Sequence, residues 1–75
     1  MAKKRAVSEG VYRVIDVIGT SSVSFEDAAS KAVATASKSL RDLRIAEVTK
    51  LDMKVEEGKV VAYRARMQLS FKYEG

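Results

Sequence analysis

Residues 61–73, which read VAYRARMQLSFKY, decide the fold of this chain. Small, polar or charged residues stand at every even position, and the odd positions are apolar or aromatic: Val61, Tyr63, Ala65, Met67, Leu69, Phe71 and Tyr73. Because successive side chains of a strand point to opposite faces, this alternation predicts one long strand with an apolar face and a basic face. At about 3.3 Å per residue it would run about 40 Å, so its apolar face needs an extended cover.

The composition indicates one small domain that is not stabilised by disulfides or by a zinc site. The chain has 75 residues with no cysteine and no histidine, which excludes disulfides, thiolate zinc sites and imidazole catalysis. A domain of this size buries only about 60% of the surface that its unfolded chain exposes. Small domains of this kind usually gain stability by associating, and we expect this one to do so.

The hydropathy and charge of the chain predict a soluble, cytoplasmic protein. No apolar run approaches the roughly 20 residues that span a bilayer, and no apolar segment of a signal peptide follows the basic residues Lys3, Lys4 and Arg5. The net charge of +4 includes this cluster, so we interpret residues 1–10 as a solvated, flexible basic arm rather than a nucleic-acid site. The domain itself is expected to span residues 11–75.

The segments before the long strand predict one further strand and one helix. Residues 11–18 are rich in β-branched residues and apolar on both faces, so this strand is expected to be covered on both sides. Residues 19–24 form a cluster of turn-forming residues. Ser24 then caps a predicted helix over 25–41, with Glu26 and Asp27 at the positive end of its dipole. Its apolar, alanine-rich stripe would lie on the long strand.

A second alternating segment completes the sheet. Residues 45–55 predict a strand with Ile45, Glu47, Thr49, Leu51, Met53 and Val55 on one face and the intervening residues on the other. The sequence Glu-Glu-Gly-Lys at 56–59 is typical of a β-hairpin loop. We therefore predict an α+β fold of order β-α-β-β, a three-stranded antiparallel sheet wrapped around one helix, with the first strand beside the last. The uncovered face of the last strand would carry Arg64, Arg66 and Gln68.

Chemistry-bearing residues are few, and they argue against an enzyme. No pair of carboxylates stands at a suggestive spacing, and the loop serines have no histidine to activate them. Arg64 and Arg66 share a strand face, where they would either bind an anion or form ion pairs with Glu47 or Asp52 on the neighbouring strand. Asp16 stands in an apolar strand, so it either pairs with an arginine across a subunit contact or joins a cation site.

Three segments together resemble the dodecin family: VYRVIDVIGTS at 11–21, LRDLRIAEV at 40–48 and YRARMQLSF at 63–71. The resemblance implies a β-α-β-β protein that assembles as a hollow homododecamer built from trimers. Dodecins that bind flavin hold stacked flavin pairs near the threefold contacts and serve as storage proteins. In them a tryptophan just before the Glu-Val of the second strand stacks on the flavin ring, and a glutamine nineteen residues later meets its polar edge.

This chain carries Ile45 and Arg64 at those two positions, so both contacts are changed. Losing an aromatic stack worth about 1–3 kcal/mol per ring would weaken flavin binding by about tenfold to several hundredfold. Asp52 stands where flavin binders commonly have an arginine, which resembles the tryptophan-less branch with calcium-binding members. Two functions stay open: a non-enzymatic flavin (riboflavin or FMN) store with a weakened pocket of Ile45, Glu47, Arg64, Arg66 and Gln68, or a flavin-blind shell that binds calcium through Asp52 and Asp16 or is purely structural.

Overall fold

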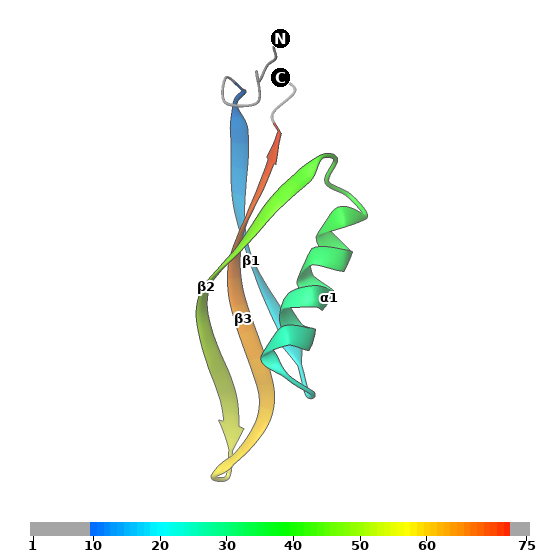
Figure 1. Cartoon of the computed structure of the whole chain (residues 1–75). Coiled ribbons are helices and arrows are strands. Elements are labelled where there is room, and N and C mark those ends of the chain that lie inside the picture. The colour runs from blue at the N-terminus through cyan, green and yellow to red at the C-terminus, as the bar shows by residue number, and fades with distance from the viewer. Residues whose placement is uncertain (1–9, 73–75) are drawn as a thin grey trace.

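The computed structural model describes residues 10–72, so most of the predicted arm and Tyr73 lie outside the described residues. The predicted order of elements is confirmed: β1 (Tyr12–Ser21), α1 (Phe25–Ser37), β2 (Leu43–Glu56) and β3 (Lys59–Lys72). The strands form one antiparallel sheet in the order β1-β3-β2. Figure 1 shows β3 in the middle of this sheet and α1 packed against one face of it. The predicted fold class is therefore confirmed.

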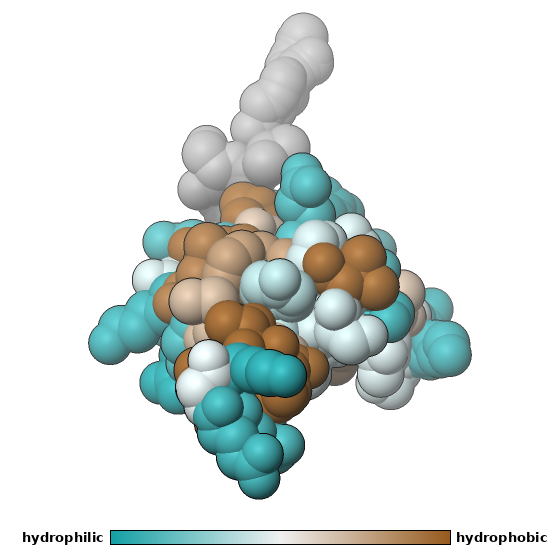
Figure 2. All heavy atoms as spheres, turned by 90° about the horizontal axis from the view of Figure 1, so that it is seen from below, coloured by the Kyte–Doolittle hydropathy of each residue, from teal (hydrophilic) through white to brown (hydrophobic). Residues whose placement is uncertain are grey.

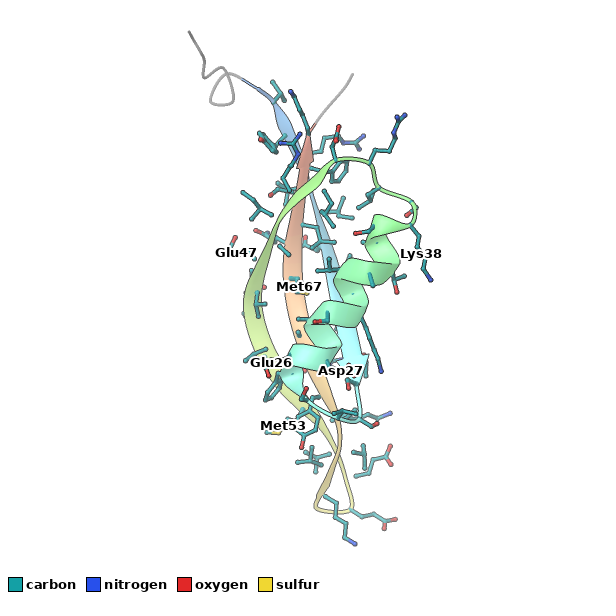
Figure 3. All side chains as sticks on the ribbon, turned by 45° about the vertical axis from the view of Figure 1, so that its right-hand side comes forward. Glu26, Asp27, Lys38, Glu47, Met53 and Met67 are labelled. Atoms are coloured by element: carbon teal, nitrogen blue, oxygen red, sulfur yellow. The ribbon has the colours of Figure 1, made fainter. Side chains whose placement is uncertain are left out.

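The core lies between β3 and α1, as the alternation of β3 predicts. Ala65, Met67 and Leu69 are buried on the helix side of the sheet, together with Ala28 of α1. Met67 lies between the helix and the sheet in Figure 3. Partly buried side chains from α1 and β1 extend this cluster, among them Ile15 and Val17. The odd positions in the middle of β3 thus hold the helix, while Val61 lies further along and is 41% exposed.

Gly19 makes the closest approach between the sheet and the helix. It lies opposite Ala65 in the register of β1 with β3. An added Cβ at Gly19 would stand 2.0 Å from the carbonyl oxygen of Ala28 and 3.0 Å from the Cβ of Ala32. Glycine is therefore required here by the contact between two backbones. The prediction that a turn begins at Gly19 is wrong, because β1 continues through Ser21 and keeps its pairing with β3.

The helix begins where the sequence predicts and ends earlier. Ser24 adopts an extended backbone, and its hydroxyl accepts a hydrogen bond of 3.0 Å from the amide of Asp27. The predicted end at residue 41 is wrong, since α1 ends at Ser37 and the next three amides bond back to the carbonyls of Thr35 and Ala36. The carbonyl of Asp42 then accepts a 3.3 Å hydrogen bond from the amide of Lys72, which fixes the approach to β2.

The regular alternation predicted for β2 is wrong from Thr49 onward. Val48 lies opposite Met67 and Lys50 lies opposite Arg66, so Thr49 is an extra residue in this strand. Its hydroxyl donates a 3.1 Å hydrogen bond to the carbonyl of Arg66. A bulge of one residue exchanges the faces of all residues beyond it. As a result Leu51 and Met53 lie on the helix side, whereas Ile45, Glu47, Lys50 and Asp52 lie on the opposite side.

The predicted hairpin between β2 and β3 closes with two residues, Glu57 and Gly58. Both have positive φ, at 52° and 77°, which matches the two-residue hairpin turn whose twist fits that of the strands. Figure 1 shows that this hairpin extends well beyond α1. Its apolar side chains are therefore not covered by the helix.

The domain is elongated, with extents of 58 × 20 × 16 Å, and exposes many apolar side chains. Against four fully buried core residues, eleven large apolar side chains of the described segment are exposed. They include Val14 and Ile18 of β1, Val48, Leu51 and Met53 of β2, and Val60 of β3. Seen from the hairpin end, apolar residues form patches on the surface, with hydrophilic residues around them (Figure 2). Within residues 10–72, α1 is too short and too polar to cross a membrane.

Candidate functional site

All seven predicted site residues lie on the face of the sheet that the helix leaves uncovered, which we call the open face. Directly opposed residues of neighbouring strands share a face, so the register assigns them. Glu47 and Asp16 flank Gln68, while Asp52 lies opposite Arg64. Ile45 lies opposite Ser70, two positions along β3 from Gln68. Arg66 lies on β3 between Arg64 and Gln68, opposite Lys50 of β2. Figure 3 shows Glu47 on the far side of the sheet from α1.

Arg64 and Asp52 form a two-pronged ion pair across β2 and β3. Nε of Arg64 donates to one carboxylate oxygen at 2.7 Å and its NH2 group donates to the other at 2.9 Å. This hydrogen bonding holds the pKa of Asp52 below its usual value and raises the pKa of Arg64. Of the two alternatives for Arg64, the ion pair with the neighbouring strand is therefore confirmed, with Asp52 as its partner. This contact occupies one edge of the guanidinium, formed by Nε and one terminal nitrogen.

Asp16, Gln68 and Glu47 form a row of oxygen-bearing side chains across all three strands. Amide and carboxylate oxygens are ligands that calcium accepts. Among residues 10–72, however, no three acidic side chains come close enough to hold a metal ion. Both alternatives for Asp16, an arginine of another subunit or a cation site, stay predictions.

Ile45 offers an exposed apolar surface at one end of the open face. Its side chain is 58% exposed and lies in the row that also contains Ser70 and the exposed Val14. This row contains no aromatic side chain for stacking, and Tyr12 lies two residues from Val14 on the same face of β1. The open face therefore combines a small apolar end with a charged middle.

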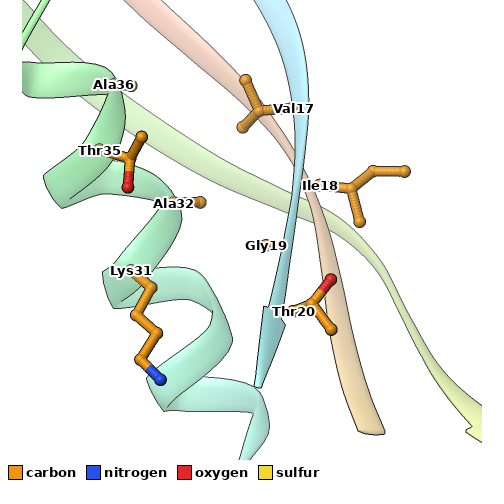
Figure 4. Close-up of a pocket in the computed structure, with 8 residues that line it drawn as sticks. All are labelled: Val17, Ile18, Gly19, Thr20, Lys31, Ala32, Thr35 and Ala36. Carbon is orange, nitrogen blue, oxygen red and sulfur yellow. The ribbon is translucent and has the colours of Figure 1, made fainter.

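Two hollows adjoin the free edge of β1. One, of about 310 Å³, lies between β1 and α1, where Val17 and the alanines of the helix face each other and Lys31 stands at one end (Figure 4). Ile18 and Thr20 point away from the helix in this view. The other hollow, of about 490 Å³, is lined by Asp16, Val17, Ile18 and Arg66 and opens toward the open face.

Sequence reasoning missed Lys50 as a member of this face together with Arg66. The register places the two side chains opposite each other, because the bulge at Thr49 shifts the pairing by one residue. A signal was present in the sequence. The apolar positions of this strand change from even numbers, at Ala46 and Val48, to odd numbers, at Leu51 and Met53. Such a change of phase indicates an inserted residue.

The fold and the residues of the open face can now be compared with known proteins. The sequence profile of the dodecin family matches residues 11–74. This chain belongs to the dodecin family. It is 47% identical over 62 residues to the calcium dodecin of Mycobacterium tuberculosis, covering 83% of this chain and 87% of that protein. The expected family is therefore confirmed.

Solved dodecin structures have the same fold. The structure of dodecin from Streptomyces coelicolor matches with a TM-score of 0.84 at 37% identity, over 91% of this chain and 97% of that one. The crystal structure of the Mycobacterium tuberculosis calcium dodecin, described as having a novel calcium-binding site, matches with a TM-score of 0.76 at 48% identity, over 85% of this chain and 91% of that one.

Proposed function

We propose that this chain assembles as a hollow homododecamer, built from trimers, that binds a small ligand on its open face without catalysing a reaction. The exposed apolar side chains on β1, β2 and β3 support the assembly, because a single copy leaves them in water. At about 25 cal/mol per Å² of apolar surface, covering them in an oligomer would add substantially to a marginal core. Size-exclusion chromatography with light scattering tests this proposal, and a particle near the 8.2 kDa of one chain would refute it.

The proposed ligand is a flavin, riboflavin or FMN, bound more weakly than by dodecins with a stacking tryptophan. The observation that carries this proposal is that Ile45, Glu47, Arg64, Arg66 and Gln68 all lie on the open face. Ile45 supplies apolar contact for a ring, and Gln68 and Glu47 supply polar contacts beside it. Because Asp52 occupies the guanidinium of Arg64, we expect this arginine to contribute little to the flavin edge.

Flavin fluorescence tests this function directly. Addition of the protein to riboflavin or FMN is expected to quench the flavin emission with saturation, since the ring would enter a site that excludes water. The variant Ile45→Trp should bind flavin about tenfold or more tightly, because it restores a stacking surface. Thr20→Trp, on β1 of the same face but beside Arg64, is the matched control. Absence of quenching in the wild type and in Ile45→Trp would refute flavin binding.

Calcium binding is the second candidate, favoured by the 47% identical relative named calcium dodecin. Asp16 is the stronger of the two predicted ligands, since Asp52 is already paired with Arg64. One chain offers Asp16 beside Gln68 and Glu47, so a full set of six to eight oxygens would need side chains of neighbouring copies.

A calcium-dependent rise in melting temperature tests this candidate. The rise is expected to disappear in Asp16→Asn and to persist in Asp27→Asn, a control aspartate on α1 whose carboxylate is bonded to Ser21 and Lys31. If magnesium and calcium raise the melting temperature equally, or if Asp16→Asn responds as the wild type does, the calcium site is refuted.

A further inference from the structure

Lys50 and Arg66 face each other across β2 and β3 on the open face. Like charges directly opposite on neighbouring strands destabilise a sheet, whereas opposite charges there stabilise it. A bound anion would offset this repulsion.

No carboxylate of the described residues forms an ion pair with Lys50 or Arg66, although the charge of Arg66 contributes, as the smallest cause, to the lowered pKa of Asp52. Asp52, the acidic residue one row away, directs both of its oxygens to Arg64 at 2.7 and 2.9 Å. The other ion pairs of residues 10–72 join Lys31 to Asp27, Arg44 to Asp42 and Lys54 to Glu56. Lys50 and Arg66 are both exposed, and none of these ion pairs includes them.

The strand geometry holds the two cations in place. The bulge at Thr49 is fastened by the hydrogen bond from its hydroxyl to the carbonyl of Arg66. Without the extra residue, Lys50 would fall opposite Ala65 on the helix side in the alternation that leads up to Val48. The bulge therefore places Lys50 opposite Arg66, although the regular alternation of β2 would put Lys50 on the other face.

The surroundings define what the pair can bind. On the β1 side, Arg66 borders a hollow that also contains the carboxylate of Asp16 and the apolar Ile18. The acidic row of Asp16 and Glu47 lies opposite Gln68, two residues along β3 from Arg66. A long polyanion such as a nucleic acid would meet these carboxylates, whereas a single anionic group would fit between Lys50 and Arg66.

We propose that Lys50 and Arg66 form a binding site for one phosphoryl group. A guanidinium can donate two parallel hydrogen bonds to phosphate oxygens, and the lysine ammonium adds a point charge from the other strand. In combination with the proposed flavin site, with which this inference shares the open face, the pair makes the protein prefer FMN over riboflavin. The phosphate would bind to Lys50 and Arg66 rather than to Arg64, because Arg64 is already hydrogen-bonded to Asp52.

Inorganic pyrophosphate, added to the full-length protein at constant ionic strength, tests the site without flavin. Its dissociation constant from calorimetry is expected to rise about tenfold in Lys50→Gln and in Arg66→Gln, because each removes a charged hydrogen-bond donor. The two variants should also melt at a higher temperature than the wild type when no phosphate is present, since the repulsion is relieved. Lys54→Gln is the control: this lysine is on the same strand and face but is paired with Glu56, and pyrophosphate affinity should be unchanged.

A second arm compares FMN with riboflavin by fluorescence quenching. The preference for FMN should vanish in Lys50→Gln, a variant outside the five residues of the proposed flavin pocket, while riboflavin affinity stays the same. If neither flavin binds but pyrophosphate binds through Lys50 and Arg66, flavin storage is refuted and the phosphoryl site stands. If pyrophosphate fails to bind the wild type, or binds both glutamine variants as well as the wild type, the phosphoryl site is refuted.

Discussion

Substitution of Gly19 by alanine tests the closest contact of the fold. The added methyl group would stand 2.0 Å from the carbonyl oxygen of Ala28, whereas ordinary contacts begin at 3.4 Å. The obstacle is backbone of α1, which cannot rotate away as a side chain would. The helix and β1 must therefore separate by more than 1 Å. A sideways shift does not avoid the clash, because the methyl group of Ala32 lies 3.0 Å from the added Cβ.

The loss of stability caused by this separation depends on the packing contacts that it opens. Ala28, Ala65 and Met67 are almost completely buried at this point, so moving the helix opens their packing. Overpacking of a core costs about 1–3 kcal/mol, and a rigid backbone obstacle places Gly19→Ala at the upper end of that range. For a domain of this size, about 3 kcal/mol lowers the melting temperature by roughly 12–24 °C.

Thermal unfolding at one fixed protein concentration measures the effect, because the stability of an assembly depends on concentration. Thr20→Ala is the matched control. It is the next residue of β1, it is exposed on the open face, and its removal of a hydroxyl leaves the helix contact intact. A melting temperature of Gly19→Ala within about 2 °C of the wild type would refute the close contact between β1 and α1.

Three other predictions concern the turn, the cap region and the bulge. Glu57→Asn should stabilise the protein by about 0.5 kcal/mol in urea unfolding, because Asn tolerates the positive φ before Gly58 better than Glu does; an unchanged midpoint contradicts this. The hydrogen bond from Ser21 lowers the pKa of Asp27, so its contribution to stability is complete above about pH 4 and is lost as the pH falls through the lowered pKa. Asp27→Asn should therefore show a smaller loss of melting temperature below pH 4, and an acid profile parallel to that of the wild type would disprove it. Thr49→Ala removes the hydrogen bond of the bulge and should lower stability by about 0.5–1 kcal/mol while weakening pyrophosphate binding; wild-type values for both would show that the hydroxyl is dispensable.

The bulge at Thr49 matters most for the candidate site. It brings Asp52 to Arg64 and Lys50 to Arg66, and so it decides which arginine is hydrogen-bonded to Asp52 and which lies opposite a lysine. The sequence predicted two equivalent arginines on one strand face. The structure makes them different, because their partners on β2 differ.

The sequence by itself determined the order of the elements, the Ser24 cap and the two faces of β3. These depend on local properties: the alternation of side chains along a strand, and a hydroxyl within reach of the next turn of helix. The open-face position of Arg64, Arg66 and Gln68 follows from the same alternation, and so does the burial of Ala65 and Met67 on the other face.

Only the tertiary structure decided the features that depend on the pairing of distant segments. β1 continues through Gly19 because β3 supplies its hydrogen-bonding partner and α1 leaves room only for a glycine. The faces of β2 beyond Thr49 depend on its register with β3, which no property of an isolated strand specifies. The long alternating strand thus defines one apolar and one charged face, but the neighbouring strands determine which charges of that face are paired and which can bind a ligand.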